Sequence, residues 1–469
     1  MSSSYTPTIG LEIHAELKTE TKMFCNSAND PEETKPNTHV CPVCMAHPGS
    51  LPVVNREAVR HVLRVGAAVN GTLADYTEFD RKNYFYPDIP KGYQISQFEY
   101  PLVKGGELAG VQLTRIHLEE DTATSKHGTG ESLVDFNRAG VPLMELVTEP
   151  VIHDAETASR FAKELQLLLR TLGAGEANME KGQMRVEVNI SVSKNATLGT
   201  KAEIKNISSF KAVERAIAYE IERQVSVLES GGTLVQETRG FNEDTGQTFS
   251  QRLKESSHDY RYFPDPDIPK LRISLIPDLT ESVLKASLPE LPSARRARYA
   301  QLGIQDSDVE TLVSDSVFQE FFESEILARL EAGDIRLGVN YLLTDVRAHY
   351  ATGVTLDNLR GGAFAEVITL VSSKVVSSRG AKDLLAKVLA DGGSPKAVAT
   401  ELGLMQNSDT RDITRLAEKL IQGNPKVVSE IQAGKSDAIK FLIGQGMKES
   451  KGSANPEVLL AALKAQLGI

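Results

Sequence analysis

The chain has 469 residues, a formal net charge of −11, 41% hydrophobic and 25% charged residues, proportions that are ordinary for a globular protein. No run approaches the ~18 apolar residues of a transmembrane helix, and the first residues lack the basic and apolar regions of a signal peptide. The composition therefore predicts a cytoplasmic protein of about three domains that does not enter a membrane, and it argues against a surface that binds nucleic acid everywhere.

The opening segment, residues 8–17, alternates apolar and polar side chains with the period of a β-strand. Such a strand places Glu12, His14 and Glu16 in a row on one face. One interpretation is a solvated outer face of a sheet. The other is a site for a divalent cation that also holds phosphate oxygens, because carboxylates with an imidazole are suitable ligands.

Carboxylates recur in later strand-like segments, which favours the cation site. Glu145 stands inside the apolar run Leu143–Val147, where an unpaired charge would be costly to bury. Met184–Val192 repeats the opening alternation, with Glu187 on its polar face. Several strands that each contribute an acid to one face would build a metal–phosphate site on an antiparallel sheet.

Residues 80–97 interleave basic and aromatic side chains, among them Arg81, Lys82 and Tyr84. This composition suits pairing with phosphate and stacking on an adenine or a tRNA base. The alternative is a loop punctuated by proline, whose tyrosines cover the core.

The chain contains three cysteines, Cys25, Cys41 and Cys44, too few for a disulfide framework and compatible with a reducing cytoplasm. The Cys41–Cys44 spacing is that of a zinc knuckle, but tetrahedral zinc needs a fourth ligand, for which His39 and His47 are candidates. A structural knuckle without metal is the alternative.

The sequence predicts an α+β class, with a β-rich domain over 1–292, a helical domain over 293–405 and a small helical tail over 406–469. Helices are expected over 154–172 and 212–230, and a linker near 288–293. In the second half, Ser307 with Glu310 fits a capping box, and Pro395, Pro425 and Pro456 fit first helical positions. The tail has nine Lys/Arg and seven Asp/Glu, which suits either a phosphate backbone or a solvated helical face.

Familiar nucleotide and hydrolase motifs are absent from the sequence: no Gly-x-x-x-x-Gly-Lys-Ser/Thr, Gly-x-Gly-x-x-Gly, His-Glu-x-x-His or Gly-x-Ser-x-Gly occurs. Any use of ATP would therefore depend on metal-bound phosphates held on a sheet.

These segments together resemble the B subunits of the tRNA-dependent aspartyl/glutamyl amidotransferases (GatB), from one end of the chain to the other and in the same order. The motifs that carry the resemblance are Gly10–His14, Phe79–Pro87, Tyr93–Gln97, His117–Asp121, Asp135–Pro142, Glu203–Ile207, Asp259–Pro264 and Gly444–Lys448 with Lys451-Gly.

The resemblance implies a cradle-shaped N-terminal domain akin to glutamine synthetase, then a helical domain and a tail that holds tRNA. It implies a ligase that forms a carbon–nitrogen bond with glutamine as amido donor. ATP phosphorylates the side-chain carboxylate of Glu-tRNA(Gln) or Asp-tRNA(Asn), and ammonia then displaces phosphate. An amidase A subunit would supply the ammonia in a heterotrimer with a small C subunit.

Residue by residue, the resemblance carries the Mg²⁺ and catalytic site to Glu12, His14, Glu120, Glu145 and Glu187. It carries ATP phosphate contacts to Arg81, Lys82 and Lys205, and tRNA contacts to Lys448 and Lys451. Three departures from the strand pattern or the family pattern stand out. Strand alternation groups Glu119, rather than Glu120, with His117; position 187 is typically Asp in the family; and Ser27 stands where many members have a fourth cysteine.

Two alternatives remain. An archaeal-type subunit that acts only on Glu-tRNA carries a large inserted domain, for which the continuous motif order leaves no room. A non-catalytic subunit that only binds tRNA or assists assembly would have an acidic face of purely structural role.

Overall fold

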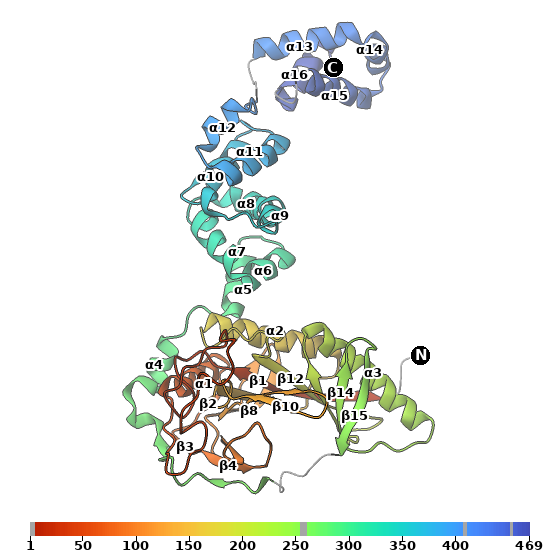
Figure 1. Cartoon of the computed structure of the whole chain (residues 1–469). Helices are drawn as coiled ribbons and strands as arrows, with labels where there is room; N and C mark the ends of the chain where they lie inside the picture. The colour runs from red at the N-terminus through yellow and green to blue at the C-terminus, as the bar shows by residue number, and fades with distance from the viewer. Residues whose placement is uncertain (1–4, 254–259, 407–409, 451–453) are drawn as a thin grey trace. The chain divides into compact units, whose positions relative to one another are not determined.

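The computed structural model of the chain describes residues 5–253, 260–406, 410–450 and 454–469. The chain forms two compact units, Met1–Pro292 and Ser293–Ile469, each of which is described by itself. Within the described ranges, no helix is both long enough and apolar enough to cross a membrane. The α+β class is confirmed, because the first unit contains a large sheet with helices and the second unit is helical (Figure 1).

A sheet in the order β15-β14-β13-β12-β1-β11-β8-β6-β2, with β7 added beside β8, forms the centre of the first unit. Its strands are β1 Thr6–Glu16, β2 Thr72–Leu73, β6 Val103–Lys104, β7 Glu107–Leu108, β8 Val111–Glu120, β11 Pro142–Thr148, β12 Met184–Ser193, β13 Ala202–Ile207, β14 Glu237–Asn242 and β15 Gln247–Leu253. The expected strands at 8–17 and 183–192 are confirmed as β1 and β12.

The sheet is mixed, so the expectation of an antiparallel sheet is wrong at one pair. β13 and β14 run parallel, whereas the neighbouring pairs along the sheet are antiparallel. The helix α3 (Phe210–Glu229) connects these two strands, and a crossover of this length returns the chain in the same direction. The helix was expected from the sequence, but its place in a βαβ unit with the two strands was not.

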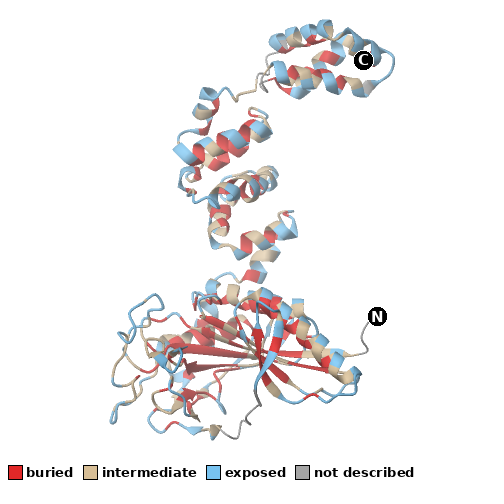
Figure 2. Ribbon diagram, turned by 45° about the vertical axis from the view of Figure 1, so that its right-hand side comes forward, coloured by how far each residue is buried: buried red, intermediate tan, exposed pale blue. Residues whose placement is uncertain are grey.

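Helices cover one face of the sheet. Ile9, Leu11 and Ile13 of β1 are fully buried in a core that includes side chains of α2 (Ala155–Thr171) and α3. The expected helices at 154–172 and 212–230 are thus confirmed, and the side chains of Asp154 and Ser209 cap their N-termini. The first unit also contains α1 Arg56–Ala68 and α4 Glu281–Ala286. Figure 2 shows the sheet as a band of buried residues.

Smaller sheets lie beside the large one and bring distant segments together. β4 Asp80–Asn83 pairs with β5 Tyr93–Ser96 and with β16 Phe263–Pro264. β3 Tyr76–Thr77 pairs with β17 Leu271–Arg272, and β9 Thr124–His127 pairs with β10 Ser132–Asp135. The loop residues around 80–97 and 260–272 are therefore fixed against each other.

The second unit is a succession of helices: α5 Pro292–Ala300, α6 Asp306–Ser314, α7 Ser316–Phe321, α8 Ile335–Tyr341, α9 Arg347–Tyr350, α10 Ala363–Ser372, α11 Ser378–Asp391, α12 Pro395–Glu401, α13 Thr410–Gly423, α14 Pro425–Gln432, α15 Ile439–Glu449 and α16 Pro456–Leu467. The three expected proline starts are confirmed. The capping box at Ser307 is wrong, because Ser307 lies inside α6 and Gln305 is the N-cap residue.

The last helices have a core of their own, which includes Ile413, Leu420, Leu442 and Leu459. A boundary between a middle helical domain and a tail near residue 405 stays a prediction.

Candidate active site

The polar face of the sheet gathers acidic and imidazole side chains from adjacent strands. Register places Glu145 of β11 opposite both His14 of β1 and His117 of β8, and Glu187 of β12 opposite Glu12. Residues directly opposite each other share a face of the sheet. The polar side chains of β1 therefore lie beside the polar side chains of β11 and β12, on the face of the sheet turned away from α2 and α3.

His14 lies at the centre of this cluster. Its Nε2 is 3.3 Å from Oε2 of Glu145, 3.6 Å from Oε1 of Glu119 and 3.9 Å from Oε1 of Glu12. Nε2 of His117 is 3.4 Å from Oε2 of Glu145. His117, Glu119 and Glu145 are buried, so the cluster is largely screened from bulk water.

Basic side chains border the cluster on two sides. Lys205 Nζ of β13 is 2.6 Å from Oε2 of Glu187 and 3.7 Å from Oε1 of Glu203. On the other side, Nη2 of Arg115 is 3.3 Å from Oε1 of Glu145. The ammonium and the guanidinium balance part of the negative charge.

The remaining charge shifts the ionisation of the cluster strongly. Burial, reinforced by Glu145 and Glu187, raises the pKa of Glu12 to about 7. Burial alone would lower the pKa of His14, but hydrogen bonding and attraction to Glu145 outweigh it and raise that pKa to about 9. The two imidazoles in turn hold the pKa of Glu145 well below its ordinary value, despite its burial. Without a metal, the cluster keeps protons at neutral pH.

The donor set fits a hard divalent cation. Three closely spaced groups have ligand atoms within 4.8 Å of one another: Glu12, His14 and Glu145; His117, Glu119 and Glu145; and Glu12, Glu187 and Glu203. Carboxylate oxygens dominate, as Mg²⁺ prefers. Nδ1 of His14 is also buried without a hydrogen-bond partner among the described residues. A bound cation would replace the protons that now offset the carboxylate charge.

The structure brings together four of the residues expected in the metal site, Glu12, His14, Glu145 and Glu187, and leaves the fifth apart. Among the described residues, Glu120 joins none of the three groups. Its carboxylate accepts hydrogen bonds from Lys91 Nζ at 2.8 Å and from the backbone N–H of Ile95 at 3.0 Å. Its role as a ligand stays a prediction that depends on the resemblance.

Three members of the cluster were not assigned from the sequence: Glu119, His117 and Glu203. The alternation of β8 pointed to Glu119 and His117, because it groups both with the polar face. The period of two along β13 could likewise have indicated Glu203, because it groups Glu203 with Lys205 on one face.

The basic residues expected to contact phosphate lie in different environments. Nε of Arg81 is 2.8 Å from the buried Asp265, and its guanidinium lies 4.3 Å over the ring of Tyr93. The adjacent Lys82 points the other way, with Nζ 5.1 Å over the ring of Tyr260. Burial would lower the pKa of Lys82, but attraction to Glu119 and Glu145, with nearby tyrosines, raises it. Lys82 and Lys205 are thus the expected cations that border the carboxylates.

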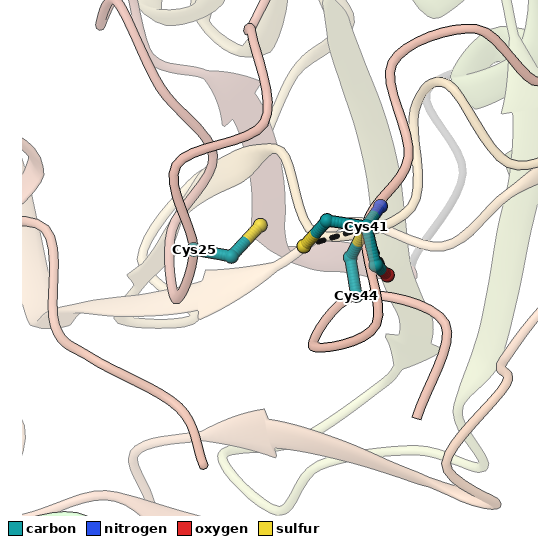
Figure 3. Close-up of side chains that lie close together, drawn as sticks. All are labelled: Cys25, Cys41 and Cys44. Carbon is teal, nitrogen blue, oxygen red and sulfur yellow. Dashed lines mark hydrogen bonds between the residues drawn. The ribbon is translucent and has the colours of Figure 1, made fainter. Parts of the chain in front are cut away.

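The three cysteines converge from two loops, one with Cys25 and one with Cys41 and Cys44 (Figure 3), and their ligand atoms lie within 4.8 Å of one another. Sγ of Cys41 and Cys44 are 3.9 Å apart, and the buried Lys22 places Nζ 3.8 Å from Cys44 Sγ. A hydrogen bond from Cys25, opposed by burial, lowers the pKa of Cys44 to about 4. Within the described chain no histidine joins this group, and Ser27 Oγ lies 3.7 Å from Cys44 Sγ.

The residues expected to contact tRNA lie in and after α15. Lys448 is exposed in the last turn of that helix. Lys451 lies outside the described residues. Contacts of either residue with tRNA stay a prediction.

Glu16, at the end of β1, gives the first testable prediction. Burial and the neighbouring Asp121 raise its pKa to about 7 in the folded protein, above its unfolded value. The stability that depends on its proton is present below the unfolded pKa of ~4.5 and is lost as pH rises through about 7. The side chain in Glu16→Gln is always neutral. Between pH 5 and pH 8 the free energy of unfolding of this variant should therefore rise by about 2 kcal/mol relative to that of the wild type, at ~1.4 kcal/mol per pKa unit.

Urea unfolding at both pH values would measure this gain in free energy of unfolding. Exposed Glu107→Gln is the control, for which the difference from wild type should not change with pH. If the difference in free energy of unfolding between Glu16→Gln and the wild type were the same at pH 5 and pH 8, the pKa of Glu16 would not be raised in the folded protein.

Two family models match the chain. The GatB/GatE catalytic domain covers residues 7–276, and the GatB domain covers residues 321–467. Together they span both compact units, and the first contains every residue of the carboxylate–imidazole cluster.

Curated relatives match over their full length. The B subunit of the aspartyl/glutamyl-tRNA(Asn/Gln) amidotransferase of Thermus thermophilus is 42% identical, over 99% of this chain and 100% of its own. The proteins of the same name from Caldanaerobacter subterraneus and Synechocystis sp. are 41% and 40% identical, each over 99% of both chains. The motif order, the cluster on the sheet and these matches agree: the chain belongs to the GatB family, the B subunits of the aspartyl/glutamyl-tRNA(Asn/Gln) amidotransferases.

Proposed function

We propose that this chain is the subunit that activates and amidates the amino acid on mischarged tRNA. The side-chain carboxylate of Glu-tRNA(Gln) or Asp-tRNA(Asn) attacks the γ-phosphorus of ATP, and ADP leaves. Ammonia then attacks the acyl phosphate, and inorganic phosphate leaves to give the amide. The first step is needed because a carboxylate has no oxygen that ammonia can displace directly.

The observation that carries this proposal is the buried carboxylate–imidazole cluster, bordered by Lys82 and Lys205. Phosphoryl transfer depends on positioning and charge neutralisation more than on covalent chemistry. Glu12, His14, Glu145 and Glu187 would hold Mg²⁺, with Glu119 as the further carboxylate that the geometry favours. When bound, Mg²⁺ would neutralise phosphate charge. The ammonium groups of Lys82 and Lys205 would orient the γ-phosphoryl oxygens.

The remaining assignments follow the family. The first unit would be a glutamine-synthetase-like cradle, and the last helices would contact tRNA through Lys448 and Lys451. A glutamine-hydrolysing amidase A subunit would supply ammonia, in a heterotrimer with a small C subunit in the cytoplasm. Arg81, held by Asp265, would shape the phosphate site rather than contact phosphate directly. Three thiolates with a hydroxyl or water would also accept Zn²⁺ at Cys25, Cys41 and Cys44.

Reconstitution tests the proposal. The chain is combined with its A and C partner subunits and Glu-tRNA(Gln), with ammonium chloride as the nitrogen source. Gln-tRNA formation and release of γ-phosphate are followed with Mg²⁺ and with EDTA. Product that requires both ATP and Mg²⁺ supports the proposal. Bound tRNA without product would instead favour a non-catalytic subunit that binds tRNA.

Glu119 and Glu120 give a direct comparison between geometry and resemblance. Glu119→Gln should lower ammonium-dependent amidation by about 10²-fold or more, because it removes a charge among the ligands. Glu120→Gln should have a smaller effect, because Lys91 and the Ile95 N–H can still bind the amide oxygen. Initial rates at saturating Mg²⁺ measure both, and the reverse order of effects would favour Glu120 as the ligand.

Mg²⁺ should stabilise the protein in the absence of nucleotide. A ligand at 100 times its Kd adds about 2.7 kcal/mol to the free energy of unfolding, which corresponds to a rise of several degrees in Tm, at ~2–4 °C per kcal/mol. Differential scanning calorimetry at increasing Mg²⁺ measures the shift. Glu107→Gln should keep the shift and Glu145→Gln should lose it; an equal shift in both variants would place the ion elsewhere.

A further inference from the structure

The small sheet β16-β4-β5 contacts the cluster, because Ser96 Oγ of β5 donates a hydrogen bond to Oε2 of Glu119 at 3.0 Å. An array of aromatic rings lies along this sheet. We call this array the aromatic platform: Tyr84, Tyr86, Phe98, Tyr260 and Tyr262. Tyr84 contacts the rings of Tyr86 and Tyr260, each with ring centroids 6.2 Å apart. Tyr262 stacks on Phe98 with centroids 4.3 Å apart and an interplanar angle of 12°. Tyr260 and Tyr262 connect the two halves at 6.1 Å.

Much of the platform is open to solvent. The exposed fractions of Tyr86 and Phe98 are 57% and 53%. Packing of the described chain does not account for rings this exposed, and a cluster of exposed apolar side chains marks a surface that binds a partner. Flat, exposed ring faces are suited to stacking on nucleobases, which all present a π-face.

The platform is held firmly although its two segments are far apart in the sequence. Nδ2 of Asn83 donates hydrogen bonds to the carbonyl oxygens of Tyr260 and Arg261, at 3.2 and 2.8 Å. Phe263 pairs with Arg81 across β16 and β4. The rings are therefore ordered before any ligand arrives.

Lys82 connects the platform to the carboxylate cluster. Its Nζ lies 5.1 Å over the ring of Tyr260, and attraction to Glu119 and Glu145 of the cluster raises its pKa. Arg261 is exposed, and the described residues give its guanidinium no acidic partner. One end of the platform thus faces the reaction site, and cations suited to phosphates lie beside it.

We infer that the aromatic platform binds the unpaired 3′-terminal nucleotides of the aminoacyl-tRNA by stacking. This inference rests on the proposed function and names where the substrate is held. The reacting carboxylate belongs to an amino acid esterified to the terminal adenosine, so that adenosine must lie beside the cluster. The platform is an array of partly exposed rings beside the cluster. Because it is open to solvent, it can accept the 3′ end of a molecule as large as tRNA.

Stacking can be measured directly with Glu-tRNA(Gln) whose terminal adenine is replaced by 2-aminopurine, a base whose fluorescence is quenched by stacking. Binding to the reconstituted complex should quench the fluorescence. Tyr86→Ala with Phe98→Ala should remove most of the quenching and weaken binding about tenfold, within the range for loss of one stacked base. The variants Leu198→Ala and Leu275→Ala are matched controls, because both side chains are exposed elsewhere in the first unit, 67% and 78%.

A second comparison uses tRNA that lacks its 3′-terminal nucleotides. Removing them should weaken binding to the wild type by about tenfold and should have little further effect on the Tyr86→Ala/Phe98→Ala variant. Unchanged quenching in that variant would overturn the inference. So would a rise in KM for ATP at unchanged tRNA affinity, which would assign the rings to the adenine of ATP. In both cases ammonium-dependent amidation by the wild type would still test the proposed function separately.

Discussion

Glu12→Gln should lower ammonium-dependent amidation by about 10³-fold or more, a loss comparable to that of a charged group that stabilises phosphoryl transfer. Glu12 belongs to two of the closely spaced ligand groups, and it lies opposite Glu187 in the sheet. The amide keeps the size of the side chain but removes the negative charge. Binding of tRNA should stay nearly unchanged, because the interaction with phosphates and bases does not depend on this carboxylate.

Gln-tRNA formation and tRNA affinity, measured on the same reconstituted complex, separate these two effects. Glu107→Gln, at an exposed position of β7, is the matched control and should retain full activity. A parallel loss of tRNA affinity in Glu12→Gln would mean that Glu12 has a structural role. A normal rate in that variant would remove Glu12 from the metal site.

Lys82→Met should lower kcat by about 10²- to 10³-fold, the usual cost of losing one group that stabilises developing charge. The same change should tighten binding of Mg²⁺ in the absence of ATP, because the ammonium now competes with a cation for the field of Glu119 and Glu145. These opposite effects distinguish Lys82 from a ligand, whose loss would weaken both activity and metal binding.

Single-turnover release of γ-phosphate measures the rate, and calorimetric titration with Mg²⁺ measures the affinity. Lys104→Met is the control, since Lys104 is exposed on β6 of the same sheet. A fall in Mg²⁺ affinity that parallels the fall in kcat would show that Lys82 supports the fold of the site instead of acting on phosphate.

Local patterns predicted the elements that build the site. The alternation of β1 identified Glu12 and His14, and the helices expected over 154–172 and 212–230 form as α2 and α3. Pairing across strands was harder to predict, because register depends on contacts far apart in the sequence. Arg81 illustrates the limit: its partner Asp265 lies 184 residues further along, so its charge could not be judged from the surrounding motif.

At Glu119 and Glu120, the two sources of prediction disagree. Strand alternation and the structure both place Glu119 beside His14 and His117. The resemblance assigned Glu120 instead. Its motif contains two adjacent acids, and a motif match alone does not show which of the two binds the metal. The parallel pair of β13 and β14 was also not predicted. A long helix between two strands allows them to pair in parallel, and the composition of the strands does not indicate this.

The central position of β1 in the sheet has a consequence for folding during synthesis on the ribosome. β1 precedes both of its partners along the chain: β11 ends at Thr148 and β12 ends at Ser193. At ~5–20 residues per second, synthesis of the second partner takes on the order of ten seconds or more. During that time β1, with its apolar residues Ile9, Leu11 and Ile13, has no partner strand and can associate with other nascent chains. We expect newly made chains to depend on chaperones that bind exposed strands. The metal site should form only after Glu187 and Glu203, about two-fifths of the way along the 469 residues, have been synthesised.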